Sequence, residues 1–210
     1  RFPVGRIFCV GRNYADHAKE MGAEVDREAP FYFLKDTGSL AASGATVPYP
    51  RGTKDFHHEM EFVVAIGAPA FDIPVERAME VVYGYACGLD MTRRDLQAAA
   101  KAKGNPWDLA KNVESGAVCG EVQPAEGKVL QSGEIVLRVN GEVRQRADLS
   151  DMIWSIPELI ADLSTYYHLQ PGDLIYTGTP EGVGPVQPGD RLEGSVEGAG
   201  RIEFEIGEAE

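Results

Sequence analysis

Two carboxylates enter an apolar strand together in the stretch HHEMEF, residues 57–62. Residues i and i+2 of a strand share a face, so Glu59 and Glu61 are expected side by side, about 7 Å apart. At an effective dielectric constant of about 20, two such charges repel by roughly 2 kcal/mol. The stretch FVVAIG that follows is apolar on both faces, which predicts a strand buried on both sides. Carboxylates there must be protonated, hydrogen-bonded or neutralised by a cation.

A third acid, Asp90, ends another apolar run, VVYGYACGL. Carboxylate oxygens without accompanying cysteine ligands suit a hard ion such as Mg²⁺ or Mn²⁺. Glu59, Glu61 and Asp90 are therefore candidate metal ligands. The spacing alone leaves a second interpretation open, in which the two glutamates lie on a solvated strand face.

His17 and Glu20 are three residues apart on a predicted helix, so their side chains are neighbours on its surface. A histidine held by a carboxylate can act as a general base on water. The alternative is an exposed contact on the helix surface without a catalytic role.

Several side chains that could donate hydrogen bonds to an anion follow Asp90 in the sequence. Arg94 and Gln97 are three apart on the next predicted helix, and Lys111 lies in the apolar context DLAKNV. Such groups can bind a carboxylate or a developing oxyanion, although ordinary surface charge is the alternative. Thr179 belongs to YTGTPEGVGP, which lacks the GK[ST] of a phosphate loop. A loop that lines a substrate site is therefore favoured over a nucleotide-binding loop.

The net charge of −13 argues against nucleic acid and anionic membranes as partners, although a bound cation would allow an anionic substrate. We find neither an apolar run near the ~20 residues of a membrane span nor the apolar core of a signal peptide. Cys9, Cys87 and Cys119 are far apart and form no CxxC, which predicts reduced, buried thiols in a cytoplasmic protein. A nucleophilic cysteine is the alternative.

The elements that must position these residues form a β-rich α+β pattern, because strands outnumber helices and do not alternate regularly with them. Strands are predicted at 7–10, 31–35, 46–49, 58–66, 81–89 and 134–147, the last a hairpin with a type I′ turn at Asn140-Gly141, and in GDLIYTGTP, GDRLEGSVEG and RIEFEIG. Helices are predicted at 13–21 with Asn13 as N-cap, at 74–81, after Thr92 as N-cap, and at 155–168 with Ser155 as N-cap.

The order and spacing of five stretches resemble the fumarylacetoacetate hydrolase family over nearly the whole chain. These stretches are CVGRNYADHAKEM, HHEMEFVVAIG, GYACGLDMTRRDLQ, KGNPWDLAK and LQPGDLIYTGTPEGVGPVQPGD. The chain is most similar to the short, single-domain acylpyruvase and fumarylpyruvate hydrolase branch, whose bacterial members act in gentisate breakdown.

The resemblance implies a mixed β-sandwich roll with a few helices, in one catalytic domain over residues 1–210. A small N-terminal subdomain with a lid helix is expected within about residues 1–50. The resemblance also implies a homodimer that binds Mg²⁺ or Mn²⁺. The implied metal ligands are Glu59, Glu61 and Asp90, the implied catalytic residues His17, Glu20 and Lys111, and the implied substrate contacts Arg94, Gln97, Lys111 and Thr179.

The implied activity is hydrolysis of the C–C bond of a 2,4-dioxo acid, fumarylpyruvate or another acylpyruvate, to pyruvate and a carboxylic acid. Oxaloacetate decarboxylation and isomerisation of a carboxymethyl-hydroxymuconate-type diacid are alternatives on the same site. A non-catalytic metal-binding domain is a third.

The chain departs from the family pattern at two places. Asp36 stands where relatives often have proline, and Asn112, Val113 and Glu114 stand where they often read Ser-Phe-Asp. We expect these departures to alter the shape of the pocket without touching the proposed ligands.

Overall fold

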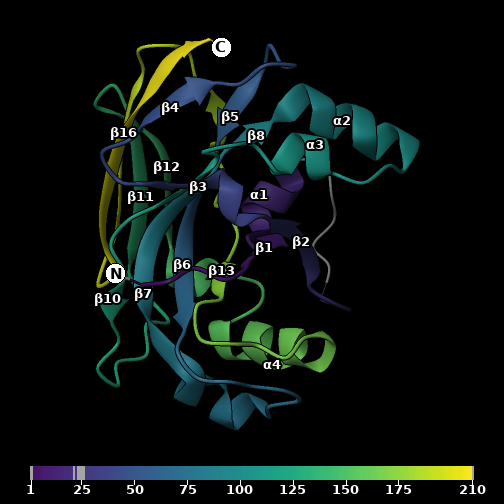
Figure 1. The fold of residues 1–210 in the computed structure, drawn as a ribbon, viewed down its shortest axis with the longest axis vertical. Coiled ribbons are helices and arrows are strands. Elements are labelled where there is room, and N and C mark those ends of the chain that lie inside the picture. Colours follow the sequence, from purple (N-terminus) through teal and green to yellow (C-terminus); the bar gives the residue numbers. More distant parts are fainter. Residues whose placement is uncertain (1, 21, 23–26, 210) are drawn as a thin grey trace.

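The computed structural model describes residues 2–20, 22 and 27–209, and the strands in this part of the chain form three sheets (Figure 1). The eight-stranded sheet follows the order β2 (Phe31–Lys35), β1 (Ile7–Gly11), β13 (Leu174–Tyr176), β6 (Met60–Ile66), β7 (Val82–Asp90), β9 (Ala117–Cys119) and β3 (Leu40–Ala42), and β10 (Gln123–Pro124) pairs with β7. The five-stranded sheet has the order β12 (Glu142–Asp148), β11 (Glu134–Val139), β15 (Arg191–Val196), β16 (Gly200–Ala209) and β4 (Thr46–Tyr49).

A three-stranded sheet has the order β14 (Gly184–Pro185), β5 (Phe56–His58) and β8 (Thr92–Arg93). The α-helices are α1 (Ala15–Glu20), α2 (Arg94–Lys103), α3 (Asp108–Lys111) and α4 (Ile156–Tyr166), and the 3₁₀ helices are η1 (Thr37–Ser39), η2 (Val75–Val81) and η3 (Leu149–Asp151). In Figure 1 the α-helices lie to the right of β6 and β7, whereas β16, in yellow, lies to the left. The predicted β-rich α+β fold is confirmed.

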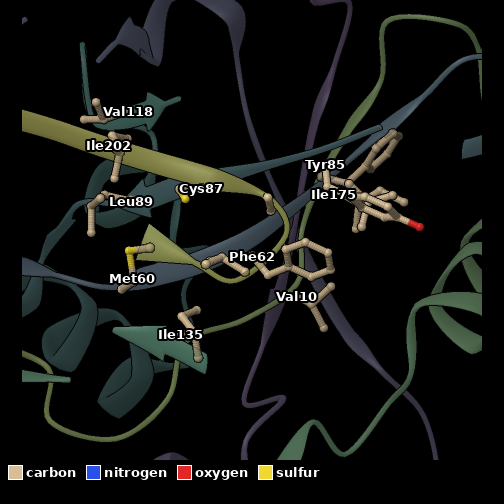
Figure 2. Packing of buried hydrophobic residues seen from close by; sticks show 14 of the residues in the cluster. Val10, Met60, Phe62, Tyr85, Cys87, Leu89, Val118, Ile135, Ile175 and Ile202 are labelled. Atoms are coloured by element: carbon tan, nitrogen blue, oxygen red, sulfur yellow. The ribbon is translucent and has the colours of Figure 1, made fainter. Parts of the chain in front are cut away.

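The central pair, β6 and β7, is covered on both faces. Met60 and Phe62 of β6 point toward the five-stranded sheet and pack in one cluster with Ile135 of β11 (Figure 2). Val63, on the opposite face, belongs to a second cluster built with β1 and β13. Glu61 shares the face of Val63 because side chains alternate along a strand. The Glu61 carboxylate therefore lies on the face of the eight-stranded sheet that carries this second cluster.

Several local predictions are confirmed. Asp90 is the last residue of β7. Asn140 and Gly141 have φ values of 52° and 82°, as a type I′ turn requires. Ser155 caps α4 in a capping box with Glu158. The strand predicted as continuous over 58–66 is instead divided into β5 and β6.

The N-cap predicted for the first helix is wrong. The helix begins at Ala15, and the Asn13 side chain instead joins two distant loops. Its Oδ1 accepts the backbone N–H of Trp154 at 2.7 Å, and its Nδ2 donates to the Thr177 carbonyl at 2.7 Å. The Asn13 side chain therefore forms long-range hydrogen bonds in place of the helix-capping bond that the local sequence pattern predicted.

Three further predictions need correction or fall outside the structure. Thr92 lies in β8 and does not cap α2, whose N-cap is Arg93. The Thr92 hydroxyl is turned inward and donates to the Asp90 carbonyl at 3.0 Å. The helix predicted at 74–81 is the 3₁₀ helix η2, a form common in short connections. Met21, the predicted end of the first helix, lies outside the described residues.

Among residues 2–20, 22 and 27–209, no helix combines the length and the apolar character that a membrane span requires.

Replacing Gly88 with Ala tests how tightly the face that carries Glu61 is packed. Gly88 of β7 pairs with Glu61 of β6, and a Cβ at this position would lie 2.6 Å from atoms of both Val63 and Tyr176. We expect overpacking to destabilise the fold by about 1–3 kcal/mol, measured as a lower midpoint in thermal unfolding.

Gly5→Ala is the control, because its nearest neighbour would be 3.7 Å away, an ordinary contact. Equal melting temperatures for the two variants would contradict tight packing behind the carboxylates.

Candidate active site

Glu59, Glu61 and Asp90 converge at one end of the central strand pair. One carboxylate oxygen from each residue lies within 4.8 Å of the others, and all three side chains are buried. Glu59 occupies the junction between β5 and β6, where its carbonyl accepts the backbone N–H of Asp90 at 2.9 Å. The structure thus brings the three predicted metal ligands together.

Two cations predicted as substrate contacts lie against these acids. Lys111 Nζ donates to Glu59 Oε2 at 2.7 Å, to Asp90 Oδ2 at 2.6 Å and to Thr92 Oγ1 at 2.8 Å. These three bonds account for all the hydrogens of the ammonium. Arg94 Nη2 donates to the other oxygen of Glu59 at 2.5 Å. Glu59 is therefore neutralised by two cations at once.

Lys35 is a member of the cluster that sequence reasoning missed. Its Nζ lies 2.8 Å from Asp90 Oδ1, and the side chain is completely buried. The ammonium also donates to the carbonyls of Met91 and Lys111. Asp90 Oδ1 has this cation at ion-pair distance but accepts no aligned hydrogen bond from the described residues. The signal for Lys35 was its place at the end of the apolar strand FYFLK, since a lysine there can be buried only with a partner.

Both glutamates are buried, but neighbouring charges shift their pKa values in opposite directions. Burial raises the pKa of Glu61, and the charges of Asp90 and Glu59 raise it further. Burial also opposes ionisation of Glu59, but Lys111 and Arg94 outweigh it and hold its pKa well below the usual range. Among the described residues, Glu61 accepts one hydrogen bond, from Gly178 N at 2.8 Å. Without a bound ion, Glu61 therefore holds a proton to higher pH than Glu59 does.

This donor set fits a divalent metal ion. The three buried carboxylates offer oxygen ligands only, which is the preference of Mg²⁺ and Mn²⁺. Asp90 Oδ1 has a lone pair that no aligned hydrogen bond from the described residues uses. Glu59, Glu61 and Asp90 would hold the ion.

His17 and Glu20 form the pair that the spacing predicted. His17 Nδ1 lies 3.1 Å from Glu20 Oε2, and the histidine is only 5% exposed. Glu20 also accepts the backbone N–H of Gly182 at 3.1 Å, which joins α1 to the loop after β13. Burial lowers the pKa of His17, and the nearby charges of Glu59 and Glu20 oppose this. The imidazole is therefore neutral near pH 7 and available as a base.

Most of the predicted site residues line one pocket. The predicted residues that line it are His17, Glu59, Glu61, Arg94, Gln97, Lys111 and Thr179. Within it, Gln97 Oε1 accepts Arg94 Nη1 at 2.5 Å. The Gln97 amide therefore keeps its N–H₂ group for another acceptor.

Gln145 is a second residue that sequence reasoning missed. This buried side chain of β12 accepts hydrogen bonds from Met60 N and His58 Nδ1, both at 3.0 Å. Its Nε2 donates to Thr179 Oγ1 and to the Pro180 carbonyl, both at 2.8 Å. These bonds fix the amide orientation, because a carbonyl can only accept. Nothing in the hairpin sequence distinguished Gln145 from its exposed neighbours, since its partners come from other elements.

The two departures from the family pattern meet in space. Asp36 N donates to Asn112 Oδ1 at 2.9 Å, and Asn112 Nδ2 donates back to Asp36 Oδ2 at 2.5 Å. Asp36 directly follows Lys35, and Asn112 directly follows Lys111. The reciprocal pair therefore joins the chain segments that carry the two buried lysines.

None of the three cysteines lines the pocket. The three thiols are free, with Cys9 and Cys87 buried and Cys119 half-buried. Burial raises the pKa of Cys9, that of Cys87 to about 12 and that of Cys119 to about 11. All three are therefore neutral thiols near pH 7, which disfavours the nucleophilic alternative.

Metal binding is expected to release a proton and to strengthen as pH rises. The raised pKa of Glu61 keeps a proton on this carboxyl to higher pH than usual, and the proton must leave before the group becomes a ligand. Below this pKa, one released proton makes the affinity rise by about tenfold per pH unit. Calorimetric titration with Mn²⁺ in buffers of different ionisation enthalpy measures the proton count.

Glu61→Gln removes the titrating group and should bind weakly without this proton release, whereas exposed Glu80→Gln should behave like the parent. Metal binding without proton release in the parent would contradict a raised pKa of Glu61.

Comparison with known proteins agrees with this geometry. Residues 6–207 match the fumarylacetoacetate (FAA) hydrolase C-terminal family. A fumarylpyruvate hydrolase from Ralstonia sp is 55% identical over 192 residues, which cover 90% of this chain and 100% of the relative. An oxaloacetate tautomerase from Arabidopsis thaliana is 44% identical, over 96% of this chain and 90% of the relative.

Among solved structures, the fumarylpyruvate hydrolase from Pseudomonas aeruginosa in complex with Mn²⁺ and pyruvate superposes with a TM-score of 0.95. It is 45% identical, and the match covers 100% of this chain and 91% of that one. A 5-carboxymethyl-2-hydroxymuconate delta-isomerase from Mycobacterium smegmatis gives a TM-score of 0.88 at 34% identity, covering 100% of this chain and 81% of that one. The buried carboxylates, the fold and these likenesses together show that this chain belongs to the fumarylacetoacetate hydrolase family.

Proposed function

We propose that the protein hydrolyses the C–C bond of fumarylpyruvate or another acylpyruvate, giving pyruvate and a carboxylic acid, with Mg²⁺ or Mn²⁺ as cofactor. The observation that carries this proposal is the buried carboxylate cluster, with His17 lining the same pocket as Glu59 and Glu61. The likeness to the Ralstonia fumarylpyruvate hydrolase over its whole length supports it. A divalent ion bound there supplies positive charge that polarises the substrate oxygens and orients the molecule.

His17 is proposed to be the general base. Its Nδ1–H donates to Glu20, so Nε2 carries the lone pair that accepts a proton from water. The hydroxyl adds to the acyl carbonyl carbon, and the bond from that carbon to the neighbouring methylene breaks. The electron pair stays on the methylene as pyruvate enolate, which takes up the proton that His17 removed.

Lys111 and Arg94 are proposed to stabilise negative charge on the substrate and on the enolate. Because the hydrogens of Lys111 already bond to Glu59, Asp90 and Thr92, its ammonium is held rigidly beside the cluster. A fixed charge of this kind needs no reorganisation during the reaction, which is where most electrostatic catalysis originates. Gln97, held by Arg94, presents its N–H₂ group as an additional donor.

Thr179 is proposed to donate its hydroxyl hydrogen to the substrate. Its oxygen already accepts Gln145 Nε2, so the hydroxyl hydrogen is left for another acceptor, and Thr179 lines the pocket. Gln145 is then a positioning residue that acts through Thr179.

Replacing Gln145 with Met should lower kcat/KM by about 10–100-fold, the usual effect of losing a partner that orients a contacting group. If Gln145 acts through Thr179, the double variant with Thr179→Val should be no worse than Thr179→Val alone. Arg144→Met, an exposed neighbour in β12, is the control. Additive losses in the double variant would show that Gln145 does not act through Thr179.

Water activation and metal dependence are tested by steady-state kinetics. His17→Ala should lower kcat by about 10²–10⁴-fold. Glu20→Gln should lower kcat and move the acidic limb of the pH profile to lower pH, because the Glu20 carboxylate raises the pKa of His17. Lys19→Met, an exposed change in the same helix, is the control. Undiminished turnover after complete removal of the metal would overturn the proposal.

The closest alternative is oxaloacetate chemistry, because the Arabidopsis relative is an oxaloacetate tautomerase. Rates on fumarylpyruvate, acetylpyruvate and oxaloacetate, measured side by side with Mn²⁺ and Mg²⁺, separate the activities. Absence of turnover across this panel with metal bound would favour a non-catalytic metal-binding domain.

We also propose a homodimer that acts in the cytoplasm in gentisate breakdown. Free cysteines favour a reducing compartment. An apolar groove lined by Phe2, Val4, Leu40 and Tyr83, the last 46% exposed, supports contact with a second copy. Light scattering tests the dimer, and a Tyr83→Glu variant should be monomeric. Cell fractionation tests the compartment, and growth on gentisate after gene deletion tests the pathway.

A further inference from the structure

Two cations on the outer wall of the active-site pocket have no part in the reaction proposed above. Arg12, just after β1, and Lys101, near the end of α2, line the same pocket as His17, Glu59 and Lys111. Both residues are exposed, whereas Lys111 is buried. The pocket therefore carries positive charge at its depth and again toward solvent.

An aromatic cluster of Phe31, Phe33 and Trp107 holds these cations in place. The ring centroids of Phe31 and Trp107 are 4.9 Å apart, and Phe33 lies within 6.5 Å of both. The Arg12 guanidinium carbon lies 5.2 Å from the Phe31 centroid, and Lys101 Nζ lies 5.1 Å from that of Trp107. A ring face attracts a cation without neutralising it, so the charge and the N–H donors remain available to an anion.

Arg12 and Lys101 lack carboxylate partners in the part of the chain that the structure describes. No ion pair within 4.0 Å involves either of them, although the chain has 33 acidic and 20 basic residues. The deeper cations differ, because Arg94 and Lys111 both bind Glu59. Burial lowers the pKa of Lys101, and the charges of Arg94 and Arg12 add to this effect. The outer end of the pocket thus holds positive charge that an anion would neutralise.

We propose that Arg12 and Lys101 bind the second carboxylate of a dicarboxylic substrate, so that the site selects acyl groups that end in a carboxylate. Given the proposed function, the dioxo-acid end of the substrate occupies the deep end of the pocket beside Glu59 and Lys111. In fumarylpyruvate, the other carboxylate extends from the acyl group toward solvent. Acetylpyruvate has the same dioxo-acid end but a neutral methyl in place of this group, so it cannot use the outer cations.

The test compares Arg12→Met, Lys101→Met and the double variant on fumarylpyruvate and acetylpyruvate. Methionine keeps an apolar side chain on the ring but removes the charge. We expect the double variant to lose about tenfold or more in kcat/KM for fumarylpyruvate, mainly through KM, since each exposed ion pair contributes up to a few fold. The kcat/KM for acetylpyruvate should change by less than about twofold. Lys103→Met, two residues further along α2 and outside the pocket, is the control for net charge.

The preference of the parent enzyme for fumarylpyruvate should also decrease with added salt, as screening of exposed charges requires. Equal losses on both substrates would assign the cations a purely structural role on the aromatic cluster and overturn the proposal. Unchanged kcat/KM values for both substrates in the double variant would also overturn it.

Failure of the proposed function gives a different result, in which the parent protein cleaves neither substrate. The outer site is then tested by equilibrium binding of fumarate and of crotonate, which has one carboxylate fewer. The proposal requires the parent protein to prefer fumarate and the double variant to lose this preference. Equal preference in both proteins would overturn it.

Discussion

The structure depends on burying three carboxylates within 4.8 Å of one another. Acids this close cannot all stay ionised in a protein interior unless cations neutralise them. Lys35 and Lys111 meet this requirement at Asp90, and Lys111 and Arg94 meet it at Glu59. Glu61 has no such partner among the described residues. Once Glu61 has lost its proton, a divalent ion would therefore neutralise a negative charge that no cationic side chain among the described residues balances.

This constraint explains why the site is assembled from so many parts of the chain. Lys35 comes from β2, Lys111 from α3 and Arg94 from α2, whereas the acids come from the central strands. The reciprocal bonds of Asp36 and Asn112 join the segments of the two lysines outside the cluster. An element that shifted would leave a buried charge without its partner, which is far more costly than the loss of an ordinary contact.

The loop after β13 is the second structural element of the site. Its backbone N–H groups donate to two carboxylates, Gly178 N to Glu61 and Gly182 N to Glu20. The Thr179 hydroxyl oxygen accepts a hydrogen bond from Gln145 Nε2. The same short segment therefore contacts a proposed metal ligand, the carboxylate that orients the proposed general base His17, and the hairpin of the five-stranded sheet. Gly182 has φ of +89°, and a Cβ there would lie 2.2 Å from the Arg144 carbonyl. Only glycine allows the chain to pass so close to β12 while it offers its N–H to Glu20.

Positive charge in the pocket has two kinds of environment. Deep in the protein, Arg94 and Lys111 are bound to carboxylates and hold fixed positions. Nearer to solvent, Arg12 and Lys101 lie on aromatic rings and keep their charge for another partner. The first arrangement suits the stabilisation of charge during a reaction, and the second suits the recognition of an anion that differs between substrates.

The sequence by itself determined the strands that carry Glu61 and Asp90, the hairpin turn at Asn140 and the pairing of His17 with Glu20, because these follow from local periodicity and spacing. Only the tertiary structure decided which distant side chains complete the site. Lys35, Gln145 and the inward hydroxyl of Thr92 have partners that are close in space but far apart in the chain. The local sequence pattern predicted Asn13 and Thr92 as helix caps. In the structure, Asn13 forms long-range hydrogen bonds, and Thr92 accepts a hydrogen bond from the buried ammonium of Lys111. A pattern along one segment carries no information about the charges that other segments will bring to it.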